Sequence, residues 1–214
     1  MKKPLLIAVD GPAASGKGTL ARKIAGYFGI PYLDTGKLYR YVGYRILQKG
    51  LDAESCISGP NLSLALEIAR GITPEGLDNK ELSREDVGQA ASIISAVPEI
   101  RAALLDFQRS IAKSPGGAVL DGRDIGTVVC SEADFKLFIT ASLAARAERR
   151  YKELQKLDGE IIYTAVLEDL RLRDERDSKR KISPLIPAKG AIHIDTTDMD
   201  EAAVFEKVLS IILA

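Results

Sequence analysis

The sequence predicts an α/β fold in which helices flank a parallel β-sheet, and two observations carry this prediction. Residues 5–9 (LLIAV) form an apolar run without polar alternation, which is typical of a strand buried on both faces of a parallel sheet. Short apolar segments then alternate with amphipathic helical patterns along the 214 residues. Sheets built in this way bind their ligands at the carboxyl ends of the strands.

A glycine-rich segment, GPAASGKGT, follows the first strand at residues 11–19. Gly11, Gly16 and Gly18 lack side chains, so successive backbone amides can turn inward around a polyphosphate at the start of a helix. Lys17 adds a mobile positive charge. The spacing matches the Walker A pattern, except that Gly18 replaces the usual Ser or Thr and the hydroxyl comes one place later, at Thr19. The segment is predicted to bind phosphate, with Mg²⁺ held more by phosphates, water and Thr19 than by a loop hydroxyl.

The next segments alternate as the fold class requires. We expect a helix over residues 19–28 that Gly29 ends, a short strand over 30–34, and a helix from residue 35 that Asp34 or Thr35 can cap. Residues 50–97 are broken by prolines and glycines and are predicted to be an insertion. Within it we expect helices over 61–70 and 83–96, the second opened by a capping-box-like pair, Ser83 and Asp86.

The second half repeats the alternation. Pro98 opens a predicted helix that continues to residue 111, and a short buried strand is expected over 118–120. A further strand over 135–140, helices over 141–157 and 163–174, a last strand over 191–195 and a last helix over 199–213 complete the chain. Residues 121–126 follow a strand directly, so they are predicted to lie at the ligand edge of the sheet.

Composition excludes several classes of protein. Lys plus Arg equals Asp plus Glu at 30 each, so no overall field attracts nucleic acid or an anionic membrane. The two cysteines, Cys56 and Cys130, match no metal spacing, and neither a secretory signal nor a long apolar span is evident. The only histidine, His193, lies in an apolar run and is predicted to be structural. We therefore expect a reduced, cytoplasmic protein without a histidine-rich metal site.

The motifs, in their order along the chain, resemble those of bacterial-type cytidylate kinases. They are GPAASGKGT, LDTGKLYR, AASIISAVPEIR, DGRDIGTVV, RAERR, RDERDSKR, PLIPA and IDTT. The resemblance implies a P-loop NTPase fold with a core (about 1–49, 98–145 and 182–214), a nucleoside monophosphate-binding insertion (about 50–97) and a lid (about 146–181). It also implies transfer of the γ-phosphate of ATP to CMP or dCMP with Mg²⁺. A monomer is the expectation for a self-contained kinase with closing parts, and the balanced charge predicts no nucleic-acid or membrane partner.

The resemblance assigns roles position by position. The residues that would hold the ATP phosphates are Gly11, Pro12, Ala13, Ala14, Ser15, Gly16, Lys17, Gly18 and Thr19. The residues that would bind the acceptor nucleotide are Thr35, Arg40, Ser92, Arg101, Arg123, Asp124, Arg173, Asp177 and Arg180. Among these, Ser92, Arg101 and Asp124 would meet the cytosine ring. Lys17, Arg123 and Arg173 would be catalytic, because phosphoryl transfer requires cations around the moving group. No protein ligand is assigned to the metal.

Some interpretations stay open at the level of sequence. Asp121 either caps a turn or meets Mg²⁺, and the arginines Arg146, Arg149 and Arg150 form either a solvated face or a partial ATP contact. The insertion reads shorter than the family's long, strand-bearing form. A related kinase that acts on AMP, UMP or shikimate, and a nucleotide-binding regulator without turnover, are the alternatives. The first alternative is disfavoured by the joint presence of Ser92, Arg101, Asp124 and the RDERDSKR block, and the second by the dense arginine set.

Overall fold

The computed structural model describes residues 4–156 and 161–214. The chain divides into two compact units, one made of Met1–Leu33 and Ile111–Ala214 and the other of Asp34–Ser110. The predicted insertion, 50–97, falls inside the second unit, and the predicted lid, 146–181, falls inside the first. Across the described ranges, no helix combines the length and the apolar character needed to cross a membrane.

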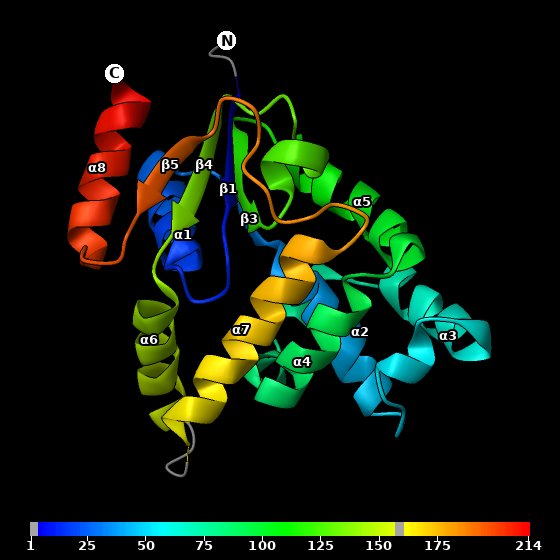
Figure 1. Cartoon of the computed structure of the whole chain (residues 1–214). Coiled ribbons are helices and arrows are strands. Elements are labelled where there is room, and N and C mark those ends of the chain that lie inside the picture. The colour runs from blue at the N-terminus through cyan, green and yellow to red at the C-terminus, as the bar shows by residue number, and fades with distance from the viewer. Residues whose placement is uncertain (1–3, 157–160) are drawn as a thin grey trace. The chain divides into compact units, whose positions relative to one another are not determined.

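A five-stranded sheet confirms the predicted α/β class (Figure 1). Its strands are β1 (Leu5–Asp10), β2 (Tyr32–Asp34), β3 (Gly117–Gly122), β4 (Phe135–Thr140) and β5 (Ile192–Asp195). Their order is β2-β3-β1-β4-β5, and β1 runs parallel to both β3 and β4, as β4 does to β5. The unbroken apolar run of residues 5–9 is explained by this position, because β1 is the central strand of the sheet, with two further strands on each side.

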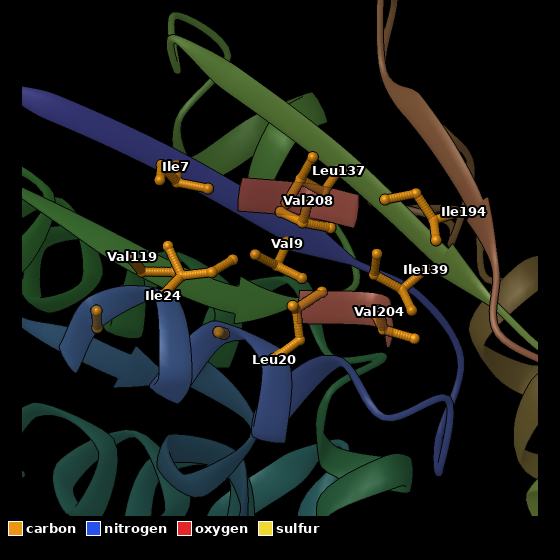
Figure 2. Close-up of a cluster of buried hydrophobic side chains, with 12 residues drawn as sticks. Ile7, Val9, Leu20, Ile24, Val119, Leu137, Ile139, Ile194, Val204 and Val208 are labelled. Carbon is orange, nitrogen blue, oxygen red and sulfur yellow. The ribbon is translucent and has the colours of Figure 1, made fainter. Parts of the chain in front are cut away.

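The helices of the first unit are α1 (Lys17–Phe28), α6 (Leu143–Gln155), α7 (Tyr163–Lys179) and α8 (Glu201–Leu213). Helices α1 and α8 supply buried side chains to one apolar cluster with the sheet (Figure 2). The side chains labelled there are Ile7, Val9, Leu20, Ile24, Val119, Leu137, Ile139, Ile194, Val204 and Val208. This cluster fixes the start of α1 against the end of β1, where the glycine-rich loop joins them.

Several predicted boundaries were wrong by a few residues. Helix α1 begins at Lys17 because Gly16, with φ 85°, already completes the turn of the loop. Helix α7 continues five residues past the predicted end, to Lys179. Its charged extension is supported by pairs one turn apart, such as Glu175 with Lys179 at 2.6 Å. The predicted end of the preceding helix, residue 157, lies outside the described residues.

The second unit is helical. It contains α2 (Thr35–Leu47), α3 (Gly59–Arg70), α4 (Glu85–Ile94), most of α5 (Pro98–Ala112) and the short turns η1 (Glu54–Cys56), η2 (Pro74–Asp78) and η3 (Lys80–Ser83). Residues 50–97 are all described and hold no strand, in agreement with the short form of the insertion read from the sequence. A β-carbon on Gly43 would lie 3.1 Å from that of Ala90, so glycine lets α2 and α4 pack closely.

One of the two predicted caps in this unit was wrong. Asp34 occupies the capping position before Thr35, the first residue of α2, as predicted, although its side chain makes no cap hydrogen bond in the ranges that the structure describes. Ser83 ends η3 instead of opening α4. The guanidinium of Arg84 forms ion pairs with Asp86 at 2.5 Å and with Glu81 at 3.1 Å. The carboxylate of Asp86, which the predicted capping box requires, is therefore paired with Arg84.

Candidate active site

The glycine-rich loop, residues 11–19, has the backbone of a phosphate cradle. Gly16 adopts the left-handed conformation at φ 85°, directly before α1. A β-carbon on Gly11 would lie 2.1 Å from the backbone oxygen of Ile139, so no other residue fits there. Because the loop opens a helix, its amides carry the partial positive charge of the helix N-terminus. This arrangement suits a bound polyphosphate.

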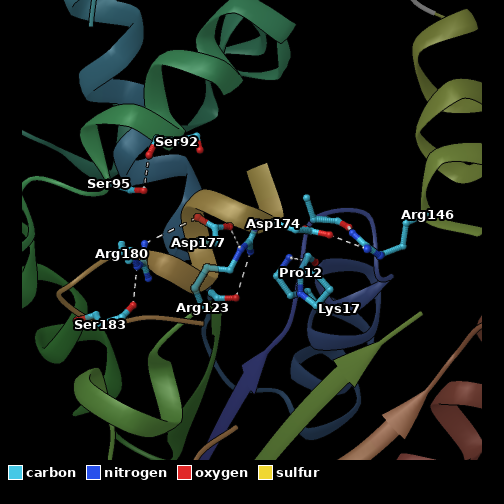
Figure 3. A network of polar contacts seen from close by, with 12 residues as sticks. Pro12, Lys17, Ser92, Ser95, Arg123, Arg146, Asp174, Asp177, Arg180 and Ser183 are labelled. Carbon is cyan, nitrogen blue, oxygen red and sulfur yellow. Dashed lines mark hydrogen bonds and ion pairs between the residues drawn. The ribbon is translucent and has the colours of Figure 1, made fainter. Parts of the chain in front are cut away.

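Side chains hold three carbonyl oxygens of the loop. The ammonium of Lys17 donates to the carbonyl of Pro12 at 3.2 Å, and Arg146 of α6 donates to that of Ala13 at 3.3 Å (Figure 3). The hydroxyl of Thr196, which follows β5, donates to the carbonyl of Ser15 at 3.1 Å. With these oxygens turned toward side-chain donors, the loop is organised to offer its amides to an anion.

Asp121 lies beside the start of α1. Its carboxylate accepts a hydrogen bond from the hydroxyl of Tyr32 at 2.6 Å, and a β-carbon on Gly18 would lie 3.4 Å from it. Asp121 lies within β3, a position that favours binding a metal over capping a turn, the two roles left open by the sequence. A carboxylate next to a phosphate loop is the hard oxygen donor that Mg²⁺ prefers. The site therefore fits a magnesium ion held by this carboxylate together with phosphate and water.

Asp177 of α7 is buried among three arginines, of which Figure 3 labels Arg123 and Arg180. The Nε of Arg123 donates to Asp177 at 2.7 Å, and the guanidinium of Arg180 lies 3.9 Å from its other oxygen. Burial by itself would raise the pKa of Asp177, but the charges of Arg123, Arg173 and Arg180 outweigh it and lower the pKa. Asp177 therefore stays ionised and holds the arginines together at one place in the first unit.

The turn after β3 carries Arg123 and Asp124, and it is anchored from β1. Both oxygens of Asp10 accept backbone amides of this turn, from Ile125 at 2.8 Å and from Gly126 at 2.7 Å. Burial raises the pKa of Asp10 from 3.8 to about 6, although the two amides oppose this rise. The ionised form is therefore costly to bury and is tolerated because both its oxygens are bonded.

In the second unit, the side chains of Arg101 and Ser92 are buried. The guanidinium of Arg101 donates to the carbonyl of Ser95 at 3.0 Å and lies 5.5 Å from the centre of the Tyr39 ring. These contacts fix its orientation. The hydroxyl of Ser92 has no hydrogen-bond partner in the ranges that the structure describes. A buried, unsatisfied hydroxyl is expected where a ligand completes the bonding.

Arg40 has a different environment from the one expected of an open anion site. Its guanidinium donates to the carbonyls of Leu82, at 2.7 Å, and Arg84, at 3.1 Å. Gly88 leaves room for it, since a β-carbon there would lie 2.8 Å from a guanidinium nitrogen. Arg40 thus ties α2 to the turn between η3 and α4, near Thr35 in sequence but with part of its bonding capacity already used.

The three arginines of α6 lie in different environments. Arg146 is buried and pairs with Asp174 of α7 at 2.7 Å, and Arg149 donates to both the hydroxyl and the carbonyl of Thr196. Arg150 pairs with the exposed Glu153 on its own helix. The solvated-face interpretation is therefore wrong for the first two, because both reach the loops around the phosphate cradle.

The structure groups the predicted residues by unit. Within the first unit it brings together Arg123, Arg173, Asp177 and Arg180, and within the second it brings Arg101 near Tyr39.

Sequence reasoning missed Asp10, Tyr32 and Thr196 as parts of the site. The available signals were weak: Asp10 is a lone carboxylate between a buried strand and the first loop glycine, and Thr196 lies in the IDTT motif, to which no role was assigned. In the ranges that the structure describes, no group of three or more His, Cys, Asp or Glu residues is placed to hold a metal.

Comparison with known proteins identifies the family of the chain. The cytidylate kinase family model matches residues 7–214. A cytidylate kinase of Paramagnetospirillum magneticum is 51% identical over 210 residues, which cover 97% of each chain, and one of Methylocella silvestris is 50% identical over 208 residues, covering 97% of this chain and 94% of its own. A solved, uncharacterised protein of Eubacterium ventriosum shares the fold, with a TM-score of 0.55 at 16% identity, over 98% of this chain and 99% of its own. The chain therefore belongs to the cytidylate kinase family.

Proposed function

We propose that the protein transfers the γ-phosphate of ATP to CMP or dCMP, giving ADP and CDP or dCDP. The observation that carries this proposal is the match of the cytidylate kinase family to residues 7–214 of a chain that contains a phosphate cradle and a buried arginine cluster. Phosphoryl transfer requires little covalent chemistry from a protein and depends on positioning and charge neutralisation. Both requirements match the residues described above. We further propose that the enzyme acts as a monomer in the cytoplasm.

In the donor part of the site, residues 11–19 bind the phosphates of ATP through their backbone N–H groups, which Pro12 alone lacks, and through the ammonium of Lys17. Asp121, oriented by the hydroxyl of Tyr32, would hold a magnesium ion together with the phosphates, and Thr19 offers a further hydroxyl. When bound, Mg²⁺ neutralises charge on the phosphate oxygens. Lys17 already bonds the carbonyl of Pro12, so its ammonium is positioned within the loop before the nucleotide arrives.

In the acceptor part, Ser92, Arg101 and Asp124 recognise the cytosine base, and Thr35 and Arg40 face the acceptor nucleotide. The orphan hydroxyl of Ser92 and the fixed guanidinium of Arg101 support this assignment. A carboxylate accepts from the amino group of cytosine, and a donor bonds its ring acceptors. Uracil presents the opposite pattern at that edge, so it would leave buried partners unpaired.

Arg123 and Arg173 stabilise the charge on the transferring phosphoryl group, and Arg180 binds phosphate beside them. Asp177 holds this set, because its ionised carboxylate bonds Arg123 directly. Its second oxygen lies toward Arg180 at 3.9 Å and is the one we assign to a sugar hydroxyl. Cations held by a buried anion need no reorganisation during the reaction, which favours the transition state.

A phosphotransfer assay that offers CMP, dCMP, UMP and AMP with Mg-ATP tests the proposal. We expect CMP and dCMP to be phosphorylated with the highest kcat/KM. A preference for AMP or UMP would show a related kinase with another acceptor, and the absence of any turnover would favour the nucleotide-binding regulator. The variant Lys17→Ala is expected to abolish transfer while the circular dichroism spectrum stays unchanged, and undiminished turnover in it would contradict the assigned role of the loop.

A further inference from the structure

Asp10 is the last residue of β1 and immediately precedes the phosphate cradle. In the sheet, Asp10 lies opposite Gly122 of β3 on one side and Phe138 of β4 on the other, so its backbone is held from both edges. Its side chain is 3% exposed. The residue therefore provides a rigid, buried point from which a carboxylate extends toward the next strand.

The carboxylate bonds the turn that follows β3. Its Oδ1 accepts the amide of Ile125 at 2.8 Å and its Oδ2 accepts the amide of Gly126 at 2.7 Å. These are the first two amides of the helical turn η4 (Ile125–Val129), which has no preceding carbonyls to bond them. Two bonds from one rigid group fix both the position and the orientation of the turn, which a single bond would not.

The two residues immediately before these amides are Arg123 and Asp124. At the other end of its side chain, Arg123 is bonded to Asp177 at 2.7 Å. Asp124 is 5% exposed, and its carbonyl accepts the amide of Val128 at 2.9 Å, so its conformation depends on the same turn. The backbone of both residues is thus set by Asp10.

We propose that Asp10 is a positioning residue that aligns Arg123 and Asp124 with the phosphate cradle through its two bonds to the amides of Ile125 and Gly126. This inference rests on the proposed function, which gives Arg123 and Asp124 their roles. It adds a residue that makes no contact with substrate, because Asp10 links β1 to Arg123, proposed for phosphoryl transfer, and to Asp124, proposed for base recognition. Both the rate with CMP and the discrimination against UMP therefore depend on this carboxylate.

The test compares the variant Asp10→Asn with the unaltered protein in the full chain. An amide has nearly the shape of the carboxylate but accepts one amide hydrogen instead of two, and its NH₂ group faces the second donor. We expect kcat with CMP to fall by about 10- to 100-fold, because displacements of about 1 Å have effects of that size. We expect KM for ATP to stay within about twofold, since the loop amides and Lys17 are unaltered, and the ratio of kcat/KM for CMP over UMP to fall.

The matched control is Asp134→Asn. Asp134 makes a bond of the same kind to β1, accepting the amide of Leu6 at 2.9 Å, but at the opposite end of the strand. We expect wild-type kinetics from this variant. A second variant, Gly126→Ala, displaces the turn from its other side, because the new β-carbon would lie 3.4 Å from Asp10 and 3.1 Å from the β-carbon of Ala188.

The outcomes separate the inference from the proposed function. A smaller loss of kcat in Gly126→Ala, with little further loss when it is combined with Asp10→Asn, supports a shared pathway. Unchanged kcat and CMP/UMP ratio in either single variant overturns the inference, as does a loss that only follows a decrease in the folded fraction. Failure of the unaltered protein to phosphorylate CMP overturns the proposed function instead.

Discussion

Neutralising Asp177 tests whether its buried charge holds the arginine cluster. The side chains of Asp177 and Arg180 are each 5% exposed and that of Arg123 is 14% exposed, so water screens these charges weakly. Breaking a buried pair by removing one partner costs about 3–5 kcal/mol. Asparagine keeps the shape and one acceptor, so we expect Asp177→Asn to lower the free energy of unfolding by about 3 kcal/mol, at the low end of that range.

The measurement is calorimetric unfolding without nucleotide, since a bound ligand would add its own stabilisation. For a chain of this size, a loss of about 3 kcal/mol corresponds to a decrease in Tm of about 6–12 °C. The pKa of Asp177 is lowered in the folded protein. Its stabilisation is therefore present above the ordinary carboxyl pKa and is lost as the pH falls through the folded value. The difference between the two proteins should be constant near neutral pH and shrink in acid.

The control variant is Glu175→Gln on the same helix. Glu175 pairs with Arg171 at 3.5 Å and with Lys179 at 2.6 Å, but all three side chains are largely exposed. Exposed pairs contribute little, and we expect no measurable change in Tm. Equal shifts from Glu175→Gln and Asp177→Asn would refute the argument, because burial would then make no difference to the effect of the charge.

Three further predictions concern a base contact, a glycine and a pH dependence. Arg101→Ala should lower the apparent affinity for CMP more than that for ATP, measured by the two KM values, and an equal effect on both would contradict its assignment to the base. Gly11→Ala should lower the free energy of unfolding by about 4 kcal/mol or more, because its β-carbon would overlap the Ile139 carbonyl. Gly26→Ala, in α1 with open space around it, should instead raise the free energy of unfolding by about 0.5–1 kcal/mol, and urea unfolding measures both. The pKa of Asp10 is raised from 3.8 to about 6 in the folded protein, so its contribution to the free energy of unfolding should fall by about 2 kcal/mol as the pH rises from about 4 to 7. This pH dependence should be absent from Asp10→Asn, and its persistence there would show that another group titrates.

Much of the sheet could be predicted because buried parallel strands have a simple signature. The apolar runs at 5–9 and 135–140 have few alternative environments, and the structure places strands at both. Residues 50–97 were harder, since short helical turns there are held by contacts distant in sequence. Arg84 illustrates this: its pairing with both Glu81 and Asp86 removed the capping box that the local pattern favoured.

The candidate active site was likewise predictable only in part. The cradle was predictable because glycine spacing and a lysine are local signals. The partners of each arginine were not, since a guanidinium such as that of Arg40 bonds either a ligand or nearby carbonyls, and only the folded chain decides between them. Asp10 gave only a weak signal, because its two bonds reach residues more than a hundred positions away.

The contacts of Arg146 and Thr196 with the loop carbonyls have a consequence for the energetics of nucleotide capture. Each contact immobilises backbone in the free protein, so the entropic penalty of ordering the cradle is met during folding. Donor nucleotide then enters a receptor that is already shaped, which favours affinity through preorganisation. Removing either side-chain contact should shift the entropic penalty to the binding step. The affinity for ATP would then be weaker and the binding entropy more unfavourable.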